Sequence, residues 1–246
     1  MRDDNKLAVI VMAAGKGTRM KSELPKVLHL LNGKPLLAYP LTLAKQINSS
    51  PIVVVVGYQA DMVRQAFKDE TLTFALQEPQ LGTGHAVMCA LPGLDGFAGH
   101  VLILNGDVPG LKLETIKDML AIHHSSQNSL TVLGMQPSDA GAYGRMVVHG
   151  DRLLRIVEFR DASEAEKQIN LVNAGIYLVE YTALANSLNK LTTDNDQHEY
   201  YLTDLVDIMN KANLRVGYYL CTDPWQVAGV NSQEELHQLE TLLGRD

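Results

Sequence analysis

Uninterrupted apolar runs mark the N-terminal part of the chain, at residues 7–13, 52–56 and 101–104. Runs without polar alternation are typical of strands that are buried on both faces, as in a parallel sheet. Stretches with helical spacing of apolar residues separate them, at residues 36–47, 61–67 and 83–91. This alternation predicts βαβ units, so residues 1 to about 135 are interpreted as a doubly wound sheet of the dinucleotide-binding type.

The middle of the chain changes character, because its strand-like segments are joined by shorter links with glycine-containing turns. Strands are expected at residues 130–135, 145–148, 153–159, 174–179 and 215–221, and helices at residues 184–191 and 204–212. These segments are expected to extend the sheet and to add a flap on one side. A last helix is predicted from residue 232, where Ser232 and Glu235 have the spacing of a capping box.

Composition narrows the functional classes. The chain has 246 residues, 46% of them hydrophobic, and a net charge of −7. This is typical of a soluble globular protein and argues against general binding to nucleic acid or a membrane surface, so an anionic substrate would need a local cluster of donors. Cys89 and Cys221 are expected to be reduced thiols in the cytoplasm, because no secretion signal precedes them. Neither cysteine has an obvious partner base in the sequence.

The loop after the first apolar run carries the strongest chemical signal. Gly15 and Gly17 allow a sharp turn that exposes backbone N–H groups, and Lys16 and Arg19 add positive charge. A helix starting there would contribute its positive end, and together these features suit a triphosphate. The loop matches neither a Walker A motif nor Gly-x-Gly-x-x-Gly. An ordinary strand-to-helix turn with surface cations is the alternative interpretation.

Three further segments offer polar groups. Lys26 follows Pro25 and could reach a phosphate, although most lysines lie solvated at the surface. Gln77 and Gln80 offer donors and acceptors for a pyrimidine edge, or else belong to a polar helix entrance. Asp107 follows a buried strand, where a carboxylate can bind Mg²⁺ or simply cap a turn.

Residues 13–20 and 24–28 resemble the signature of the sugar nucleotidyltransferase superfamily. The similarity is greatest to the uridyltransferase half of the bifunctional N-acetylglucosamine-1-phosphate uridyltransferase/glucosamine-1-phosphate acetyltransferase family, and it runs from about residue 7 to residue 231. It implies an α/β fold with a doubly wound Rossmann-like mixed, mostly parallel sheet of the nucleotide-diphospho-sugar transferase type, and a small β-rich sugar-binding subdomain. Residues 1–231 would form the nucleotidyltransferase domain and residues 232–246 a C-terminal helix.

The resemblance implies a reaction of UTP with N-acetyl-α-D-glucosamine 1-phosphate that yields UDP-N-acetylglucosamine, a peptidoglycan precursor, and pyrophosphate. Mg²⁺ is the implied cofactor, with Asp107 and Asn231 as its ligands, and Arg19, Lys26 and Asp107 are the implied catalytic residues. Another sugar 1-phosphate or nucleotide, as in thymidylyl and cytidylyl transferases, is an alternative activity. A non-catalytic sugar-nucleotide binding protein is a third possibility.

The resemblance also assigns binding residues. Nucleotide contacts are expected from Met12, Ala13, Ala14, Gly15, Lys16, Gly17, Thr18, Gln77, Gln80, Gly82, Thr83, Asn105 and Gly106. Sugar contacts are expected from Gly144, Glu158, Asn173, Tyr201 and Thr203. Two positions depart from the family pattern: Asn105 stands where tyrosine is frequent, and Arg160 where lysine is frequent.

Family members usually carry a C-terminal β-helix of hexapeptide repeats, and residues 1–246 contain no such repeat. The chain is therefore expected to lack acetyltransferase activity and to be a monomer or weak oligomer, without nucleic-acid or membrane partners. His123 and His124 are expected late in a helix, where cations complement the helix dipole.

Overall fold

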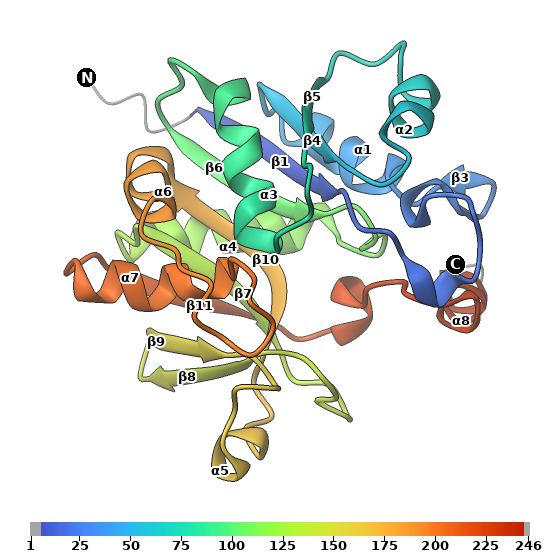
Figure 1. The fold of residues 1–246 in the computed structure, drawn as a ribbon. Coiled ribbons are helices and arrows are strands. Elements are labelled where there is room, and N and C mark those ends of the chain that lie inside the picture. Colours follow the sequence, from blue (N-terminus) through green and yellow to red (C-terminus); the bar gives the residue numbers. More distant parts are fainter. Residues whose placement is uncertain (1–5, 244–246) are drawn as a thin grey trace.

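A nine-stranded mixed sheet forms the centre of the molecule in the computed structural model, which describes residues 6–243 (Figure 1). The strand order is β5-β4-β1-β6-β10-β7-β11-β9-β8. The strands are β1 (Leu7–Ala13), β4 (Ile52–Val56), β5 (Thr73–Leu76), β6 (His100–Asn105), β7 (Leu130–Met135), β8 (Arg145–His149), β9 (Arg152–Val157), β10 (Val172–Glu180) and β11 (Val216–Cys221). A separate hairpin pairs β2 (Leu30–Leu31) with β3 (Lys34–Pro35).

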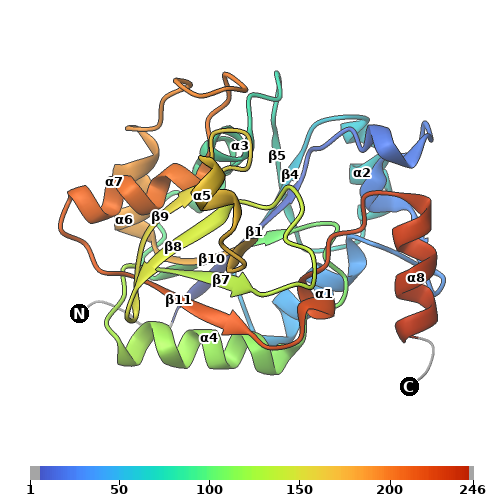
Figure 2. The ribbon, with the colours of Figure 1, turned by 90° about the horizontal axis from the view of Figure 1, so that it is seen from below.

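Helices cover both faces of the sheet (Figure 2). Ala8 and Ile10 of β1 pack in one core with α3 (Thr83–Ala90), α6 (Tyr181–Leu188) and α7 (Leu205–Lys211). Val9 and Val11 pack in a second core with α1 (Ala38–Gln46), α2 (Ala60–Ala66) and α4 (Leu113–Ser125). Successive side chains of a strand point to opposite faces, so burial on both faces requires an unbroken apolar run.

The sheet continues beyond the first 135 residues, as expected, and a later strand is also inserted within it. β6 and β7 are not neighbours, because β10 lies between them and runs antiparallel to both. β7 and β11 then pair in parallel, so the segments after residue 135 complete one continuous sheet. Beyond them, β8 and β9 form an antiparallel hairpin beside the short helix α5 (Glu164–Lys167), at the bottom of Figure 1.

His123 near the end of α4 is buried and neutral, so the expectation of a cation at this position is wrong. Its side chain is 1% exposed, and its Nδ1 lies 2.8 Å from Oγ1 of Thr131. Burial, together with the neighbouring His100 and His124, lowers the pKa of His123 to about 3. The ring therefore serves packing rather than the helix dipole.

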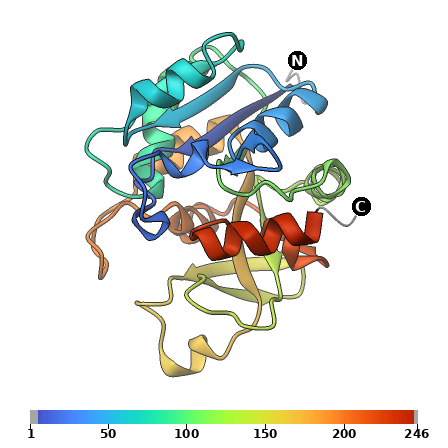
Figure 3. The same ribbon diagram turned by 90° about the vertical axis from the view of Figure 1, so that its right-hand side faces the viewer.

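The last helix, α8 (Gln233–Leu243), begins with the predicted capping box. The N–H of Glu235 donates to Oγ of Ser232 at 3.2 Å, and Oε2 of Glu235 accepts from the N–H of Ser232 at 3.2 Å. Leu239 packs against Leu31 and Leu36, so α8 lies beside the N-terminal hairpin (Figure 3). The predicted ranges 1–231 and 232–246 include residues 1–5 and 244–246, which lie outside the described residues. Within residues 6–243, no helix has the length and apolar character needed to cross a membrane.

Candidate active site

A cavity of about 360 Å³ opens at the carboxyl ends of β1 and β6. Ligands of open α/β sheets bind at this edge, and the volume suits a small molecule. Ten of the predicted nucleotide contacts line it: Met12, Ala13, Ala14, Gly15, Lys16, Gln77, Gln80, Gly82, Thr83 and Asn105. Lys26 and Asp107 line the same cavity, whereas Gly17, Thr18, Arg19 and Gly106 are not among its lining residues.

The glycine-containing loop does not lead into an α-helix, which corrects the expected helix terminus. Only one 3-10 turn follows, η1 (Thr18–Met20), flanked by Gly17 and Lys21 in left-handed conformations with φ of 62° and 50°. At Gly17 a Cβ would lie 2.6 Å from Cβ of Lys26, so glycine is required for the lysine stem to pack there. The loop therefore offers backbone N–H groups and side-chain cations, without a helix dipole. The exposed Arg19 lies within electrostatic reach of Tyr143.

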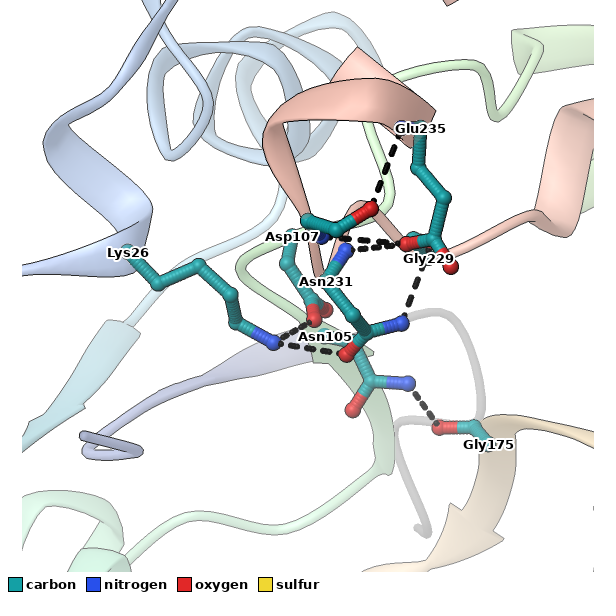
Figure 4. Close-up of polar contacts among 8 residues, drawn as sticks. Lys26, Asn105, Asp107, Gly175, Gly229, Asn231 and Glu235 are labelled. Atoms are coloured by element: carbon teal, nitrogen blue, oxygen red, sulfur yellow. Dashed lines mark hydrogen bonds and ion pairs between the residues drawn. The ribbon is translucent and has the colours of Figure 1, made fainter. Parts of the chain in front are cut away.

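Lys26, Asp107 and Asn231 meet at one point, although they are far apart in the sequence (Figure 4). Lys26 opens the turn η2 (Lys26–Leu28), and Asp107 follows the carboxyl end of β6. The ammonium of Lys26 forms an ion pair with Oδ2 of Asp107 and donates to Oδ1 of Asn231 at 3.1 Å. The Lys26 and Asp107 side chains are only 15% and 18% exposed, so water screens this pair less than a surface pair.

Asn231 is oriented by its neighbours. Its backbone N–H donates to Oε2 of Glu235 at 2.6 Å, and its Nδ2 donates to the carbonyl of Gly229 at 3.2 Å. The N–H of Val230 donates to the carbonyl of Asp107 at 2.9 Å, which joins this segment to the end of β6. Oδ1 of Asn231 is thereby directed toward Lys26 and Asp107.

The two glutamines of the cavity are held by hydrogen bonds to the backbone. Nε2 of Gln77 donates to the carbonyl of Gly82 at 2.9 Å and lies 3.3 Å from Nδ1 of His85. Nε2 of Gln80 donates to the carbonyl of Ala14 at 2.8 Å. Because its Nε2 is engaged, Gln77 presents its Oε1 as an acceptor rather than as a second donor.

The five residues predicted to contact the sugar gather in a second cluster. Oγ1 of Thr203 donates to Oε1 of Glu158 at 3.0 Å, and the N–H of Asn173 donates to the carbonyl of Gly144 at 2.9 Å. A Cβ on Gly144 would lie 3.5 Å from both carboxylate oxygens of Glu158. Burial raises the pKa of Glu158, which the hydrogen bond from Thr203 partly offsets. Tyr201 is buried, and its hydroxyl accepts from Nε2 of Gln197 at 2.8 Å.

Asn105 connects the cavity to this second cluster. Its Nδ2 donates to the carbonyl of Gly175 at 3.2 Å, and the N–H of Gly175 donates to Oδ1 of Asn173 at 2.8 Å. Gly175 has φ of 75° where the register of β10 shifts, and a Cβ there would lie 2.5 Å from Nδ2 of Asn105. The small amide at position 105 thus joins the end of β6 to the irregular part of β10. Arg160, the other residue that departs from the family pattern, is exposed, and its Nη1 lies 3.9 Å from Oδ2 of Asp196.

Sequence reasoning missed three residues near the cavity. Glu199 lines it, and Glu235 holds Asn231. Tyr143 lies within electrostatic reach of Glu235, Asp107 and Arg19. Burial and the two carboxylates raise the pKa of Tyr143, and Arg19 partly offsets this rise. Glu235 had a sequence signal, because it belongs to the predicted capping box. Glu199 and Tyr143 had none beyond their neighbours.

Other candidate chemistry is weak among the described residues. Within residues 6–243, no three His, Cys, Asp or Glu side chains are placed to share a metal ion. Sγ of Cys89 lies 3.7 Å from Nε2 of His85, so this thiol has the partner base that the sequence did not reveal. Burial raises the pKa of Cys89, which disfavours the reactive thiolate.

The donor set at Asp107 and Asn231 fits a divalent cation. One carboxylate and one amide oxygen converge on a single position, and the positive charge of Lys26 lies there in this structure. Mg²⁺ takes oxygen ligands and uses few from the protein, with phosphate oxygens and water filling the remainder. These two residues therefore match the ligand type that Mg²⁺ requires, and phosphate and water would supply its other ligands.

Comparisons with known proteins show the family to which the chain belongs. The sequence profile of the MobA-like NTP transferase domain matches residues 9–175. The chain is 47% identical over 232 residues to the bifunctional protein GlmU of Geobacter metallireducens, covering 94% of this chain and 49% of that protein. It is 41% identical over 237 residues to the bifunctional protein GlmU of Desulfotalea psychrophila, covering 96% of this chain and 70% of that protein.

A solved structure with the same fold is described as a putative glucose-1-phosphate thymidylyltransferase from Bacillus anthracis in complex with a sucrose. The TM-score is 0.73 at 15% identity, and the alignment covers 96% of this chain and 94% of that one. The chain spans about half the length of several GlmU proteins that it matches, such as the one from Geobacter metallireducens.

Proposed function

The chain belongs to the MobA-like NTP transferase family, and we propose that it is a UTP:N-acetyl-α-D-glucosamine-1-phosphate uridylyltransferase that acts in the cytoplasm. The products would be UDP-N-acetylglucosamine and pyrophosphate. The similarity to GlmU proteins over almost the whole chain supports this assignment. The observation that carries it is that Lys26 and Asp107 pair in the cavity lined by the glycine-containing loop, where Lys26 also donates to Asn231.

Recognition of the nucleotide would depend on the loop and on Gln77. Gly15 and Lys16 line the cavity, where backbone N–H groups and an ammonium could hold phosphate oxygens. Oε1 of Gln77 could accept the N3–H of uracil, a donor that cytosine lacks, because Nε2 is held by Gly82. This orientation favours UTP over CTP.

The reaction would be a direct displacement. A phosphate oxygen of the sugar phosphate attacks the α-phosphorus of UTP, and the bond from that phosphorus to the bridging oxygen of pyrophosphate breaks. The nucleophile is already anionic, so repulsion between polyanions is the main obstacle. Lys26 and Arg19 would offset this repulsion, so that catalysis consists of positioning and electrostatic stabilisation.

Mg²⁺, held by Asp107 and Asn231, would neutralise phosphate charge at the reacting end of the cavity. Hydrogen bonds to Glu235 and Gly229 keep Asn231 in place for this role. The backbone hydrogen bond from Val230 to Asp107 holds the segment of Asn231 next to Asp107. Mg²⁺ would thus receive oxygen ligands from two segments that are distant in the sequence, one containing Asp107 and the other Asn231.

The sugar would bind in the cluster around Glu158. Its carboxylate and the side chain of Asn173 offer hydrogen-bonding groups of the kind that sugar hydroxyls require. Asn105 joins this cluster to the nucleotide cavity, so both substrates would lie on a continuous polar surface. Tyr201 and Thr203 support the same cluster from the segment that precedes α7.

A product assay tests the proposal. The chain is incubated with UTP, N-acetylglucosamine 1-phosphate and MgCl₂, and the nucleotide products are identified by mass spectrometry. UDP-N-acetylglucosamine and pyrophosphate should form in equal amounts. Tight binding of UTP or of UDP-N-acetylglucosamine without turnover would favour a non-catalytic binding protein instead.

A further inference from the structure

The ammonium of Lys26 lies between the two oxygens that the proposed function assigns to a metal ion. It pairs with Oδ2 of Asp107 and donates to Oδ1 of Asn231 at 3.1 Å (Figure 4). Lys26 is also the residue that the proposed function directs toward phosphate. The same ammonium therefore has two possible anionic partners, and in the structure it contacts Asp107 and Asn231.

Lys26 and a metal ion cannot both occupy this position. Mg²⁺ binds oxygen ligands at about 2.0–2.1 Å, and an ammonium hydrogen-bonded to the same oxygens would lie beside it with a like charge. Both side chains of the Lys26–Asp107 pair are mostly buried, so screening by water would relieve little of that repulsion. Metal binding to Asp107 thus requires Lys26 to leave.

We propose that Lys26 is a resident cation that competes with the metal for Asp107 and Asn231 until a nucleotide draws it away. This inference rests on the proposed function, because that function places the metal at these two residues. It adds that the free protein binds metal weakly, and that the weakness comes from Lys26. The nucleotide supplies the alternative partner for the ammonium.

The exchange needs no movement of the backbone. Cβ of Lys26 packs against Gly17, where any larger residue would collide with it, so the base of the side chain is fixed. The rest is a flexible four-carbon stem, and Lys26 lines the cavity in which the triphosphate would lie. Rotation of the stem is therefore enough to carry the ammonium from Asp107 to a phosphate.

Coupling between the two ligands follows. A nucleotide that attracts Lys26 leaves Asp107 and Asn231 open to metal, and a metal that displaces Lys26 leaves its charge available to phosphate. By linkage, each ligand increases the affinity for the other by the same factor. In a variant that lacks the ammonium, the part of this coupling that passes through Lys26 disappears.

The test is a titration with Mn²⁺ in the absence of nucleotide, followed by electron paramagnetic resonance of the free ion. Lys26→Met, which keeps an unbranched side chain as far as Cε but lacks the ammonium, should bind Mn²⁺ about 5- to 30-fold more tightly than the wild type, the effect of removing one competing cation. Lys45→Met, which removes a surface cation paired with Glu70, should bind Mn²⁺ as the wild type does. Equal or weaker binding by Lys26→Met would overturn the inference.

A double variant locates the metal. Lys26→Met combined with Asp107→Asn should lose the gain, and a gain that persists would place the metal elsewhere and overturn the inference. A second readout uses the unmodified protein, in case Lys26→Met does not fold. Saturating Mg²⁺ should increase acetylation of the Lys26 amine by acetic anhydride, relative to Lys45, in quantitative mass spectrometry. Unchanged labelling of Lys26 would contradict the displacement.

These measurements use no nucleotide and no sugar phosphate. The product assay with the wild type therefore decides the proposed function separately. An active enzyme whose Lys26→Met variant binds Mn²⁺ no better than the wild type would retain its function and lose this inference.

Discussion

The backbone N–H of Asn231 donates a 2.6 Å hydrogen bond to Oε2 of Glu235. Glu235 lies in the first turn of α8 and forms a capping box with Ser232, so one carboxylate both caps the helix and holds Asn231. Gln233 of the same turn donates to the carbonyl of Met20 at 3.3 Å. The start of α8 therefore connects the proposed metal ligand to the loop that follows β1.

Removal of the Glu235 carboxylate should weaken metal binding. In Glu235→Ala, the Mg²⁺ concentration for half-maximal turnover is expected to rise about 10- to 100-fold, the usual cost of losing a partner of a metal ligand. Ser232→Ala is the matched control, because it breaks the capping box at about 1 kcal/mol and keeps the acceptor for Asn231. Magnesium titration of turnover separates the two. Equal metal requirements in both variants would limit Glu235 to a helix cap.

Loss of the Lys26 ammonium should lower turnover. Lys26→Ala is expected to reduce kcat about 10²-fold or more, the scale of losing one electrostatic stabiliser of the transition state. Lys45→Ala, at the surface pair with Glu70, should keep normal kcat. Steady-state assays of pyrophosphate release measure both, and near-normal kcat in Lys26→Ala would remove it from the reaction.

Replacement of Asp107 should change the response to metal. Asp107→Asn keeps the size of the side chain but removes the only carboxylate of the Asp107–Asn231 pair, so saturation of turnover should shift to higher Mg²⁺. The check is turnover as a function of MgCl₂ at fixed UTP and sugar phosphate. A curve that superimposes on that of the wild type would take Asp107 out of the metal site.

Gln77 should determine the preference between UTP and CTP. Gln77→Leu removes the acceptor for the N3–H of uracil, and kcat/KM for UTP should fall about 10-fold or more, as for a lost buried hydrogen bond. CTP should be affected less, because it lacks this donor. The ratio of the two kcat/KM values is the measurement, since a general folding defect would reduce both. An unchanged ratio would exclude Gln77 from base recognition.

His123 should make stability depend on pH. Its pKa is lowered to about 3 in the folded protein and is about 6.5 in an unfolded chain, so between these values the unfolded state binds more protons. The free energy of unfolding should therefore fall as pH decreases below about 6.5, by up to about 1.4 kcal/mol per pH unit. His123→Gln should flatten this slope in urea unfolding, whereas His124→Gln should keep most of it. Equal slopes in wild type and His123→Gln would contradict this account.

Much of the sheet could be predicted from local pattern. The bounds of β1 and β4 coincide with the apolar runs, because burial on both faces leaves no polar position in either strand. β5 was missed, because its ends are exposed at the edge of the sheet. The insertion of β10 between β6 and β7 was missed for a different reason, since strand order depends on contacts between distant segments.

The sequence identified most residues of the candidate site, but it did not indicate how their side chains contact one another. Motifs identified Lys26 and Asp107, and the structure brings them together with Asn231. The ion pair itself has no sequence signal, because it joins residues 81 positions apart. The expected helix after the glycine-containing loop fails at Lys21, whose left-handed conformation ends the single turn η1.

The proposed activity is the transfer of the uridylyl group of UTP to N-acetylglucosamine 1-phosphate. The most direct measurement is kcat/KM for pyrophosphate release with UTP, dTTP, CTP and ATP, each against N-acetylglucosamine 1-phosphate, glucosamine 1-phosphate and glucose 1-phosphate. We expect the highest value for UTP with N-acetylglucosamine 1-phosphate, and no turnover after Asp107→Asn at low Mg²⁺. A higher value for another nucleotide and sugar, or no pyrophosphate with any pair, would contradict it.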